Sequence, residues 1–244
     1  MADFFMAFDA NYAPYAGNPV RSIKHFHPDA RIHAVITPDV KERIDGVEYS
    51  VYNPKYVCKI KNGITGKVFP PVVYNFIKAV DIVDLDRAIL MPVDCVLCNS
   101  ADELFETEVG ESGLAAVAMN KKSSSHNMQK MMANWSGGYS IEPRLYNHPS
   151  FNTGGMVFDF KIMREQNAFP ILHKLMMEYG MSEMAALCIY AEDKWKALED
   201  RFCARDTWIK HTKDVVILDY AGACKPWVKK HKPKHRKEWD KWLQ

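Results

Sequence analysis

Three apolar runs of the sequence are each followed by a carboxylate, and these three carboxylates are candidates for a functional site. The runs cover residues 4–8, 87–93 and 214–218, and the carboxylates that follow them are Asp9, Asp94 and Asp219. In open α/β sheets, ligands bind outside the carboxyl ends of the strands. Two or three carboxylates at that rim would suit a hard divalent cation that bridges a diphosphate. For each one taken alone, a solvated strand end or a helix cap is the alternative.

A literal Asp-x-Asp sequence, Asp84 to Asp86, is the weaker candidate for binding this cation. It precedes the run 87–93, so it lies at the amino end of the predicted strand, away from the expected site. Asp94 follows the same run and lies at the carboxyl end. We therefore predict Asp94 and Asp219 as the metal ligands and regard Asp84 and Asp86 as solvated turn residues.

The elements that must position these side chains alternate between strands and helices. Short apolar runs predict strands over residues 4–8, 31–36, 87–93, 114–119, 155–160 and 214–218. Helical spacing and capping residues predict helices that begin near residue 19 and cover 73–83, 100–105, 161–179 and 182–196. This alternation is typical of an α/β fold with a mostly parallel sheet, which residues 214–218 would close. The polar segment 121–147 has no clean period and predicts a long, mobile loop or irregular helices.

Composition places the chain among ordinary globular proteins. Hydrophobic residues make up 48% of the 244 residues, and no stretch approaches the roughly 20 apolar residues that a membrane helix needs. The N-terminus has an acid at position 3 and no basic segment, which is not typical of a secretory signal. Cys95 and Cys98 form a lone C-x-x-C without the second ligand pair that zinc requires. We therefore predict buried, reduced thiols and a cytoplasmic location.

The segment 225–244 differs from the rest of the chain in its charge. It contains eight Lys or Arg residues against two acidic ones, whereas the whole chain has a net charge of only +2. Trp239 and Trp242 are interleaved with these cations, which suits peripheral contact with an anionic membrane surface. Such a mixture can also bind nucleic acid, although the small net charge does not favour that partner. A terminal helix docked on the domain, with a solvated basic face, is the third alternative.

Four segments resemble motifs of the family 8 retaining glycosyltransferases. Residues 87–97, with Asp-Glu-Leu-Phe at 102–105, resemble the family's YLDADVLV…DELF segment, and residues 151–161 resemble its FNSGVMVINLK segment. Residues 219–227, Asp-Tyr-Ala-Gly-Ala-Cys-Lys-Pro-Trp, are similar to its HFxGxxKPW motif. Residues 9–12 resemble its first nucleotide-contacting turn. These segments follow the family's order and span nearly the whole chain.

The resemblance implies a GT-A-type nucleotide-sugar-binding fold over residues 1–224, with residues 225–244 as a tail that packs on it or extends from it. It also implies transfer of a hexose from a UDP-sugar to a saccharide or glycan acceptor, with retention of configuration. A non-catalytic nucleotide-sugar-binding or interaction protein on the same fold is the alternative. Pro92 favours this alternative because it stands where the family has the first Asp of its metal motif. Asp219 also favours it, because it replaces a metal-binding His.

The resemblance and the residue types together predict the donor site. Asp94 and Asp219 would hold Mn²⁺ or Mg²⁺ in a shell of oxygen ligands. Lys225, near Gly222, would contact the diphosphate, and a solvated tail lysine is the alternative. Tyr12 would stack on the base, or it would simply pack within its turn.

Further residues are predicted at the base edge and around the sugar. Asp9 or Asn11 would bind the edge of the base. Asn152, Gly154 and Gly155 would line the sugar pocket together with Glu183, and a tight turn before a strand is the alternative for the first three.

Two residues are predicted to be catalytic, Asn152 and Glu183. Glu183, which only loosely matches a family Asp-Gln pair, would be the nucleophile or a stabilising group. Alternatively, a diphosphate oxygen would take the proton of the acceptor, so that no protein base is needed. The acceptor itself cannot be read from the sequence, because its contacts would come from variable loops such as 121–147.

Overall fold

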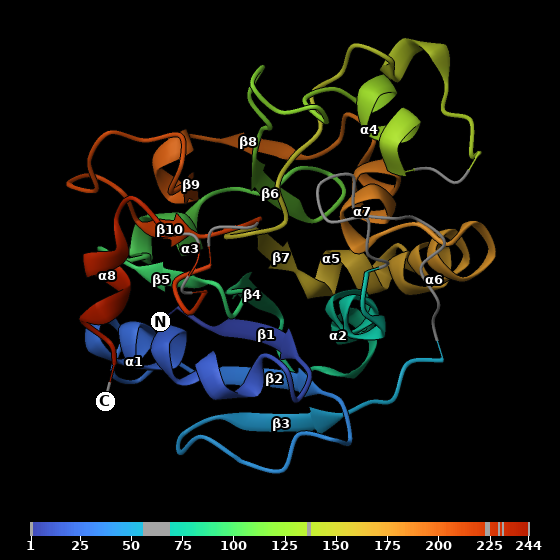
Figure 1. Cartoon of the computed structure of the whole chain (residues 1–244). Coiled ribbons are helices and arrows are strands. Elements are labelled where there is room, and N and C mark those ends of the chain that lie inside the picture. The colour runs from blue at the N-terminus through green and yellow to red at the C-terminus, as the bar shows by residue number, and fades with distance from the viewer. Residues whose placement is uncertain are drawn as a thin grey trace.

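A seven-stranded sheet forms the centre of the protein in the computed structural model, which describes residues 2–55, 69–135, 138–222, 225–228, 230 and 232–243 (Figure 1). Among these residues the strand order is β3-β2-β1-β4-β7-β6-β8. The strands are β1 (Phe4–Phe8), β2 (Ile32–Ile36), β3 (Glu48–Val51), β4 (Arg87–Leu90), β6 (Leu114–Val117), β7 (Val157–Asp159) and β8 (Lys196–Leu198). Only β7 runs antiparallel to its described neighbours, β4 and β6. The predicted α/β class with a mostly parallel sheet is therefore confirmed.

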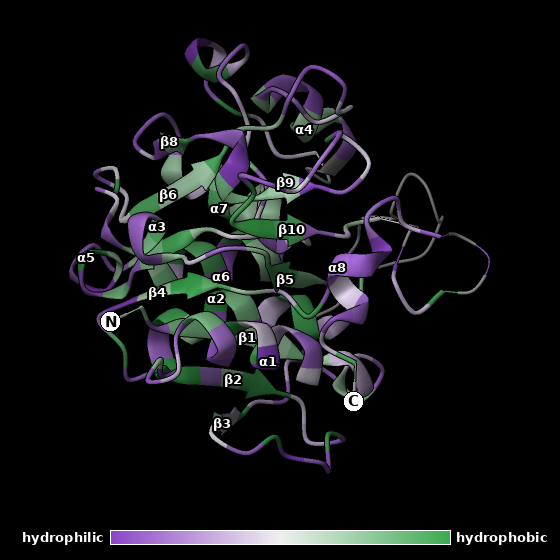
Figure 2. Cartoon of the chain, turned by 90° about the vertical axis from the view of Figure 1, so that its left-hand side faces the viewer, coloured by the Kyte–Doolittle hydropathy of each residue, from purple (hydrophilic) through white to green (hydrophobic). Residues whose placement is uncertain are grey.

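Helices cover both faces of this sheet. They are α1 (Gly17–Phe26), α2 (Tyr74–Ile82), α3 (Asp102–Glu106), α4 (Met128–Trp135), α5 (Phe160–Glu165), α6 (Ala168–Tyr179), α7 (Glu183–Ala191) and α8 (Arg236–Asp240). Alternate residues of β1 enter two different cores: Phe5 packs with α2, α5, α6 and α7, whereas Phe4 and Met6 pack with α1. Figure 2 shows this arrangement as apolar strands inside a largely polar outer layer. A strand buried on both faces reads as a continuous apolar run, which is why β1 and β2 were predictable.

The prediction that residues 214–218 close the main sheet is wrong. Ile217–Asp219 forms β10, which lies in a separate small sheet between β5 (Cys95–Leu97) and β9 (Ala204–Arg205). The predicted strand 87–93 is also too long, because β4 ends at Leu90 and a turn precedes β5. β10 runs antiparallel to β5, so that Asp219 pairs with Cys95. This pairing places the end of β10 beside the turn that carries Asp94.

Two predicted helices are shorter than expected, and each break has a local cause. The helix predicted over 161–179 is divided at Asn167, whose φ of 52° lies in the left-handed region that Asn tolerates. The helix predicted over 182–196 begins after Ser182, whose hydroxyl accepts a hydrogen bond from the Ala185 N–H, and it ends before Glu192, which has φ 50°. In the segment 121–147, α4 and a 3₁₀ turn at Pro143–Leu145 match the irregular-helix alternative.

The C-terminal segment packs against the domain. Asn18 and Arg21 of α1 donate hydrogen bonds to the carbonyls of Trp239 (3.4 Å) and Trp242 (2.6 Å). Trp239 is 2% exposed and lies in a third core that includes Tyr220. Trp227 stacks on the ring of Tyr15, with a centroid distance of 4.1 Å and an interplanar angle of 8°. The docked-helix alternative for this segment therefore describes its position in the structure.

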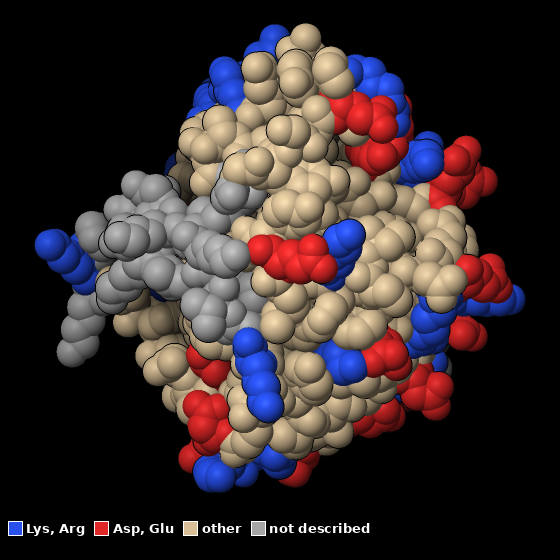
Figure 3. Space-filling view, turned by 90° about the vertical axis from the view of Figure 1, so that its right-hand side faces the viewer, with Lys and Arg blue, Asp and Glu red and all other residues tan. Residues whose placement is uncertain are grey.

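Charged side chains of one sign do not gather on the face that Figure 3 draws. On that face, basic and acidic side chains are interspersed around a mostly uncharged surface (Figure 3). Within the described parts of the chain, no helix combines the length and the apolarity needed to cross a bilayer.

The packing of Trp239 predicts that the C-terminal segment stabilises the domain. Trp239→Ala should lower the free energy of unfolding by about 3–5 kcal/mol, as is usual for a large buried aromatic residue. Leu243→Ala, at a side chain that is 54% exposed, is the matched control and should change it by less than about 0.5 kcal/mol. Urea denaturation measures both values. Equal, small effects of the two substitutions would show that the segment is not part of the cooperative core.

Candidate functional site

A cavity of about 560 Å³ lies at the carboxyl ends of β1 and β4, where the small sheet meets the main one. Its lining comes from the end of β1, the turn after β4, the loop before β7, the start of α7, and the region of β9 and β10. Seven of the predicted residues line this one cavity: Tyr12, Asp94, Asn152, Gly154, Glu183, Asp219 and Gly222. The topology therefore brings together side chains that are far apart in the sequence.

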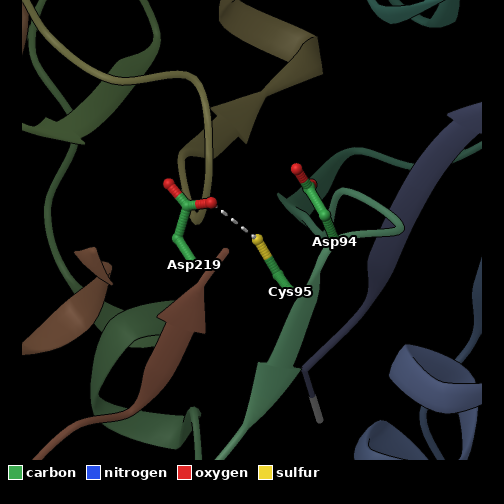
Figure 4. Close-up of side chains that lie close together, drawn as sticks. All are labelled: Asp94, Cys95 and Asp219. Carbon is green, nitrogen blue, oxygen red and sulfur yellow. Dashed lines mark hydrogen bonds between the residues drawn. The ribbon is translucent and has the colours of Figure 1, made fainter. Parts of the chain in front are cut away.

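Asp94, Cys95 and Asp219 form a compact cluster at the edge of the cavity. One potential ligand atom from each residue lies within 4.8 Å of the other two. Figure 4 shows the three side chains converging from the start of β5 and the end of β10, with the Cys95 sulfur beside Asp219. The Cys95 Sγ lies 3.8 Å from Asp219 Oδ1. The two predicted metal ligands are therefore close enough to share one cation.

Asp219 is held rigidly, because both of its oxygens accept hydrogen bonds. Asn152 Nδ2 donates to Oδ2 at 2.8 Å, and the Ala221 N–H donates to Oδ1 at 2.7 Å. Burial raises the pKa of the Asp219 carboxyl, and the nearby Asp94 charge raises it further. Arg205, Lys225 and the Asn152 hydrogen bond act in the opposite direction. Asn152, which was predicted to bind sugar, here orients a predicted metal ligand.

Lys225 forms an ion pair with Asp94. Its ammonium donates a hydrogen bond to Asp94 Oδ2, and both side chains are only 15% exposed. Burial lowers the pKa of the Lys225 ammonium, but its attraction to Asp94 outweighs burial, so the net pKa is raised. Lys225 is therefore a positively charged residue within the site, not a solvated lysine of the tail.

The chemistry of this cluster fits a divalent cation. Two carboxylates can supply anionic oxygen ligands, and each oxygen has two lone pairs, of which a hydrogen bond uses one. The Lys225 ammonium already occupies a position against Asp94, which shows that this position accepts positive charge.

The turn after β1 is organised by Asp9. Its carboxylate accepts hydrogen bonds from the Asn11 N–H (3.0 Å), the Tyr12 N–H (3.2 Å) and Asn11 Nδ2 (3.2 Å). Tyr12 lines the cavity, and its ring also packs edge-on against Trp227 at 5.8 Å. Asp9 and Asn11 lie in the same turn, but they are not among the residues that line the cavity.

The predicted glycines have different roles in the structure. Gly154 lines the cavity, and a Cβ there would lie 3.5 Å from Asp219 Oδ2 and 3.2 Å from Cys203 Sγ. Gly155 has φ 64°, and a Cβ there would lie 2.8 Å from the Cβ of Cys203, so its small size serves this packing. Gly222 lines the cavity and has φ 92°, a left-handed conformation that favours glycine.

Glu183 is the first residue of α7, and its side chain lines the cavity. Its Oε2 atom is buried and has no hydrogen-bond partner among the described residues. Burial raises the pKa of Glu183 to about 7, although hydrogen bonds from backbone N–H groups oppose the shift. Near neutral pH this carboxyl can therefore donate a proton or accept one, as a catalytic group must.

Two residues near the site could not be assigned to it by sequence reasoning. Arg205, which lines the cavity, lies on the two-residue strand β9, which is too short to give a pattern, and its buried Nε has no partner among the described residues. Cys95, which follows Asp94 directly, was predicted only as a buried thiol together with Cys98, and Cys98 packs in a different core. The cavity also has an apolar wall of Phe69, Val72, Val73 and Phe76 and a polar one of Ser123, Ser124, Ser125 and Asn134.

Known proteins share sequence features and the fold of this chain. The family model described as glycosyl transferase family 8 matches residues 3–231 of the chain. No curated protein matches the chain at a significant level. Among solved structures, the galactosyltransferase LgtC, in complex with donor and acceptor sugar analogs, is 18% identical with a TM-score of 0.76. That match covers 98% of this chain and 94% of LgtC.

A second solved structure is similar over the whole of this chain. The apo form of the glycosyltransferase GlyE from Streptococcus pneumoniae is 16% identical, with a TM-score of 0.68. The match covers 99% of this chain and 59% of the GlyE chain. The predicted GT-A-type fold and the resemblance that the motifs carry are thus both confirmed.

The buried carboxyl of Glu183 predicts a pH dependence of stability. Its pKa is about 7 in the folded protein against an ordinary 4.5, so the folded state holds a proton that the unfolded state has lost between these values. Wild-type stability should therefore fall as the pH rises through this window. Glu183→Gln removes the titration, so its stability relative to wild type should rise from pH 4.5 to pH 8.

Urea denaturation of both proteins across this range measures the difference. Glu165→Gln, on an exposed part of α5, is the matched control for the removal of one negative charge. A stability difference between Glu183→Gln and wild type that is the same at both ends of the range would contradict the prediction.

Proposed function

The chain belongs to glycosyl transferase family 8, and we propose that it transfers a hexose from a UDP-sugar to an acceptor hydroxyl with retention of configuration. The observation that carries this proposal is the cluster of Asp94, Asp219 and Lys225 at the edge of a cavity large enough for a ligand. Such a cluster suits a diphosphate, because both a divalent cation and an ammonium neutralise phosphate oxygens.

The diphosphate is the leaving group, so its developing negative charge must be stabilised. Mn²⁺ or Mg²⁺ held by Asp94 and Asp219 would supply Lewis-acid stabilisation of this charge. Lys225 would exchange its ion pair with Asp94 for a hydrogen bond to a diphosphate oxygen. Gly222, in its left-handed turn at the cavity, would let the backbone approach the same phosphates closely.

The remaining predicted contacts are arranged on either side of the diphosphate. Tyr12 would stack on the base, because its ring already forms one wall of the cavity. Asp9 and Asn11 would act at the base edge, or indirectly by fixing the turn that positions Tyr12. Asn152 and Gly154 would contact the sugar. Gly155 would contribute by allowing the turn before β7 to pack against Cys203.

Two routes for the catalytic step would retain the configuration of the sugar. In the first, a diphosphate oxygen takes the proton of the acceptor hydroxyl on the same face of the sugar. In the second, Glu183 acts as nucleophile or stabilising group, with Asn152 orienting the sugar. The unpartnered, buried oxygen of Glu183 at the cavity supports a role in substrate contact, because buried polar groups normally have hydrogen-bond partners.

A saccharide or glycan acceptor is consistent with the polar wall of the cavity, which Ser123, Ser124, Ser125 and Asn134 form. Hydroxyl and amide groups of this kind both donate and accept hydrogen bonds, as recognition of sugar hydroxyls requires. The cytoplasmic location and the contact of residues 225–244 with a membrane remain predictions. In the latter case the exposed lysines would make the contact, because Trp239 is buried.

The assay that tests this function measures UDP release from a panel of UDP-sugars, with and without Mn²⁺. The wild-type protein should release UDP from at least one donor in the presence of Mn²⁺. Tight UDP-sugar binding without turnover on any acceptor would instead support the non-catalytic binding protein.

Substitution of Asp94 and of Asp86 tests which end of β4 carries the metal ligand. Asp94→Ala should abolish the metal-dependent part of UDP binding, because Asp94 lies in the cluster at the carboxyl end of β4. Asp86→Ala is the matched control and should leave binding unchanged, because Asp86 precedes β4. Isothermal titration calorimetry with UDP and Mn²⁺ measures both. Equal losses in two folded variants would rule out the assignment of Asp94.

Lys225 offers a second test of the diphosphate site. Lys225→Ala should weaken UDP binding roughly tenfold to a hundredfold, the loss expected for a charge-assisted hydrogen bond of about 1.5–3 kcal/mol. The exposed Lys232 is the control, and Lys232→Ala should change UDP affinity little. Because Lys225 pairs with Asp94 in the unliganded protein, Lys225→Ala should not weaken the binding of Mn²⁺ alone.

Calorimetry at low and high salt completes this comparison. Small, equal and salt-sensitive effects of both lysine substitutions would show that the C-terminal segment acts only as an electrostatic patch.

A further inference from the structure

Cys95 is the third member of the cluster, and the proposed function gives it no role. We propose that Cys95 binds the divalent cation as a thiolate together with Asp94 and Asp219, so that the site prefers thiophilic cations such as Zn²⁺ and Co²⁺ over Mg²⁺. This inference rests on the proposed function, because it extends the same metal site. It replaces the shell of oxygen ligands expected from the sequence with a mixed sulfur and oxygen shell.

The distance between the two nearest ligand atoms carries the geometric argument. Zinc binds cysteine sulfur at about 2.3 Å and carboxylate oxygen at about 2.0–2.2 Å, so one cation at a tetrahedral or wider angle holds the two atoms roughly 3.5–3.8 Å apart. The Cys95 Sγ and Asp219 Oδ1 lie 3.8 Å apart. The ligand atom of Asp94 is within 4.8 Å of both. Little movement is therefore needed for all three to reach one ion.

The backbone fixes Cys95 in this position. Cys95 is the first residue of β5 and is paired with Asp219 of β10, so the two ligand-bearing residues belong to the same rung of the small sheet. The thiol is fully buried, and its one hydrogen bond within the described structure goes to Asp219. Figure 4 shows the sulfur beside the Asp219 carboxylate, with the Asp94 carboxylate on its other side.

On coordination, the Cys95 sulfur would exchange its proton for the cation. The S–H bond breaks, its proton leaves to the buffer, and the sulfur lone pair forms the bond to the cation, without oxidation or reduction. A thiolate favours borderline and soft cations, whereas Mg²⁺ requires oxygen ligands in near-ideal octahedral geometry. The selectivity of the site thus depends on one sulfur atom.

Cobalt reports directly on sulfur ligation. Titration of the full chain with Co²⁺ should give a near-ultraviolet sulfur-to-cobalt charge-transfer band, and Cys95→Ser should remove it. The affinity for Co²⁺ should fall by about tenfold or more in this variant, since even outer-shell partners of a metal ligand contribute about 10- to 100-fold. The affinity for Mg²⁺ should change much less than that. Cys98→Ser, at the residue that directly follows β5, is the matched control, and it should keep the band.

Two outcomes would overturn the inference: a wild-type protein that gives no sulfur-to-cobalt band, and a band that survives in Cys95→Ser. In the second case, loss of the band in Cys203→Ser would assign the sulfur to Cys203 instead. X-ray absorption at the zinc edge of the wild-type protein needs no substitution, and it should find one sulfur at about 2.3 Å. This measurement decides the question even if Cys95→Ser does not fold, because a shell without sulfur would exclude Cys95 as a ligand.

Failure of the inference can be separated from failure of the proposed function. Mn²⁺-dependent UDP binding that is lost in Asp94→Ala but unchanged in Cys95→Ser, with no sulfur in the zinc shell, would overturn only the role of Cys95. Co²⁺ binding that is unaffected by Asp94→Ala would remove the proposed metal site itself, and the inference with it.

Discussion

Asp94 and Asp219 lie close together in a place where water screens their charges poorly. The rest of the site must offset the repulsion between these two carboxylates. Asp94 and Asp219 reach the same edge of the cavity because β10 runs antiparallel to β5. Two like charges at this separation repel each other, and burial disfavours ionisation further. The Lys225 ammonium and the hydrogen bonds to Asp219 offset this cost. A cation supplied with the substrate would offset it in another way.

The proposed function would use an ammonium and a metal ion in one site. A charged group removed from water needs a partner, and an unpaired buried charge is costly. Lys225 provides that partner for Asp94, and it lies on a segment that follows Gly222, a residue in a left-handed turn. If a diphosphate and a cation entered together, as the proposed function requires, the ammonium would acquire a new acceptor as it left the old one. The cation and the diphosphate would then favour each other's binding.

The C-terminal segment connects this electrostatic arrangement to the core. Lys225 reaches into the site, and Trp227, two positions later, packs against Tyr12 and Tyr15 in the turn after β1. Trp239 then closes a small core against Tyr220, the residue that follows Asp219. The Lys-Pro-Trp sequence thus joins the end of the cavity that is proposed to bind the diphosphate to the turn that is proposed to receive the base. Stability of the segment and geometry of the site are consequently coupled.

The sequence alone determined those features that depend on local pattern. Buried strands read as apolar runs, so β1 and β2 were predictable, and the position of Asp94 after a strand and of Asp86 before it followed directly. The motifs were sufficient to identify the family. Glu183 and Lys225 were also singled out, although their environments could not be described.

Tertiary structure decided everything that depends on which strands become neighbours. A run such as 214–218 has the same pattern whether it closes a large sheet or joins a small one, because periodicity carries no information about the partner strand. That choice alone places Cys95 opposite Asp219 and makes it a candidate ligand. Arg205, on a strand of two residues, left no pattern to read. The raised pKa of Glu183 arises from burial, which is a property of the assembled fold and of no single segment.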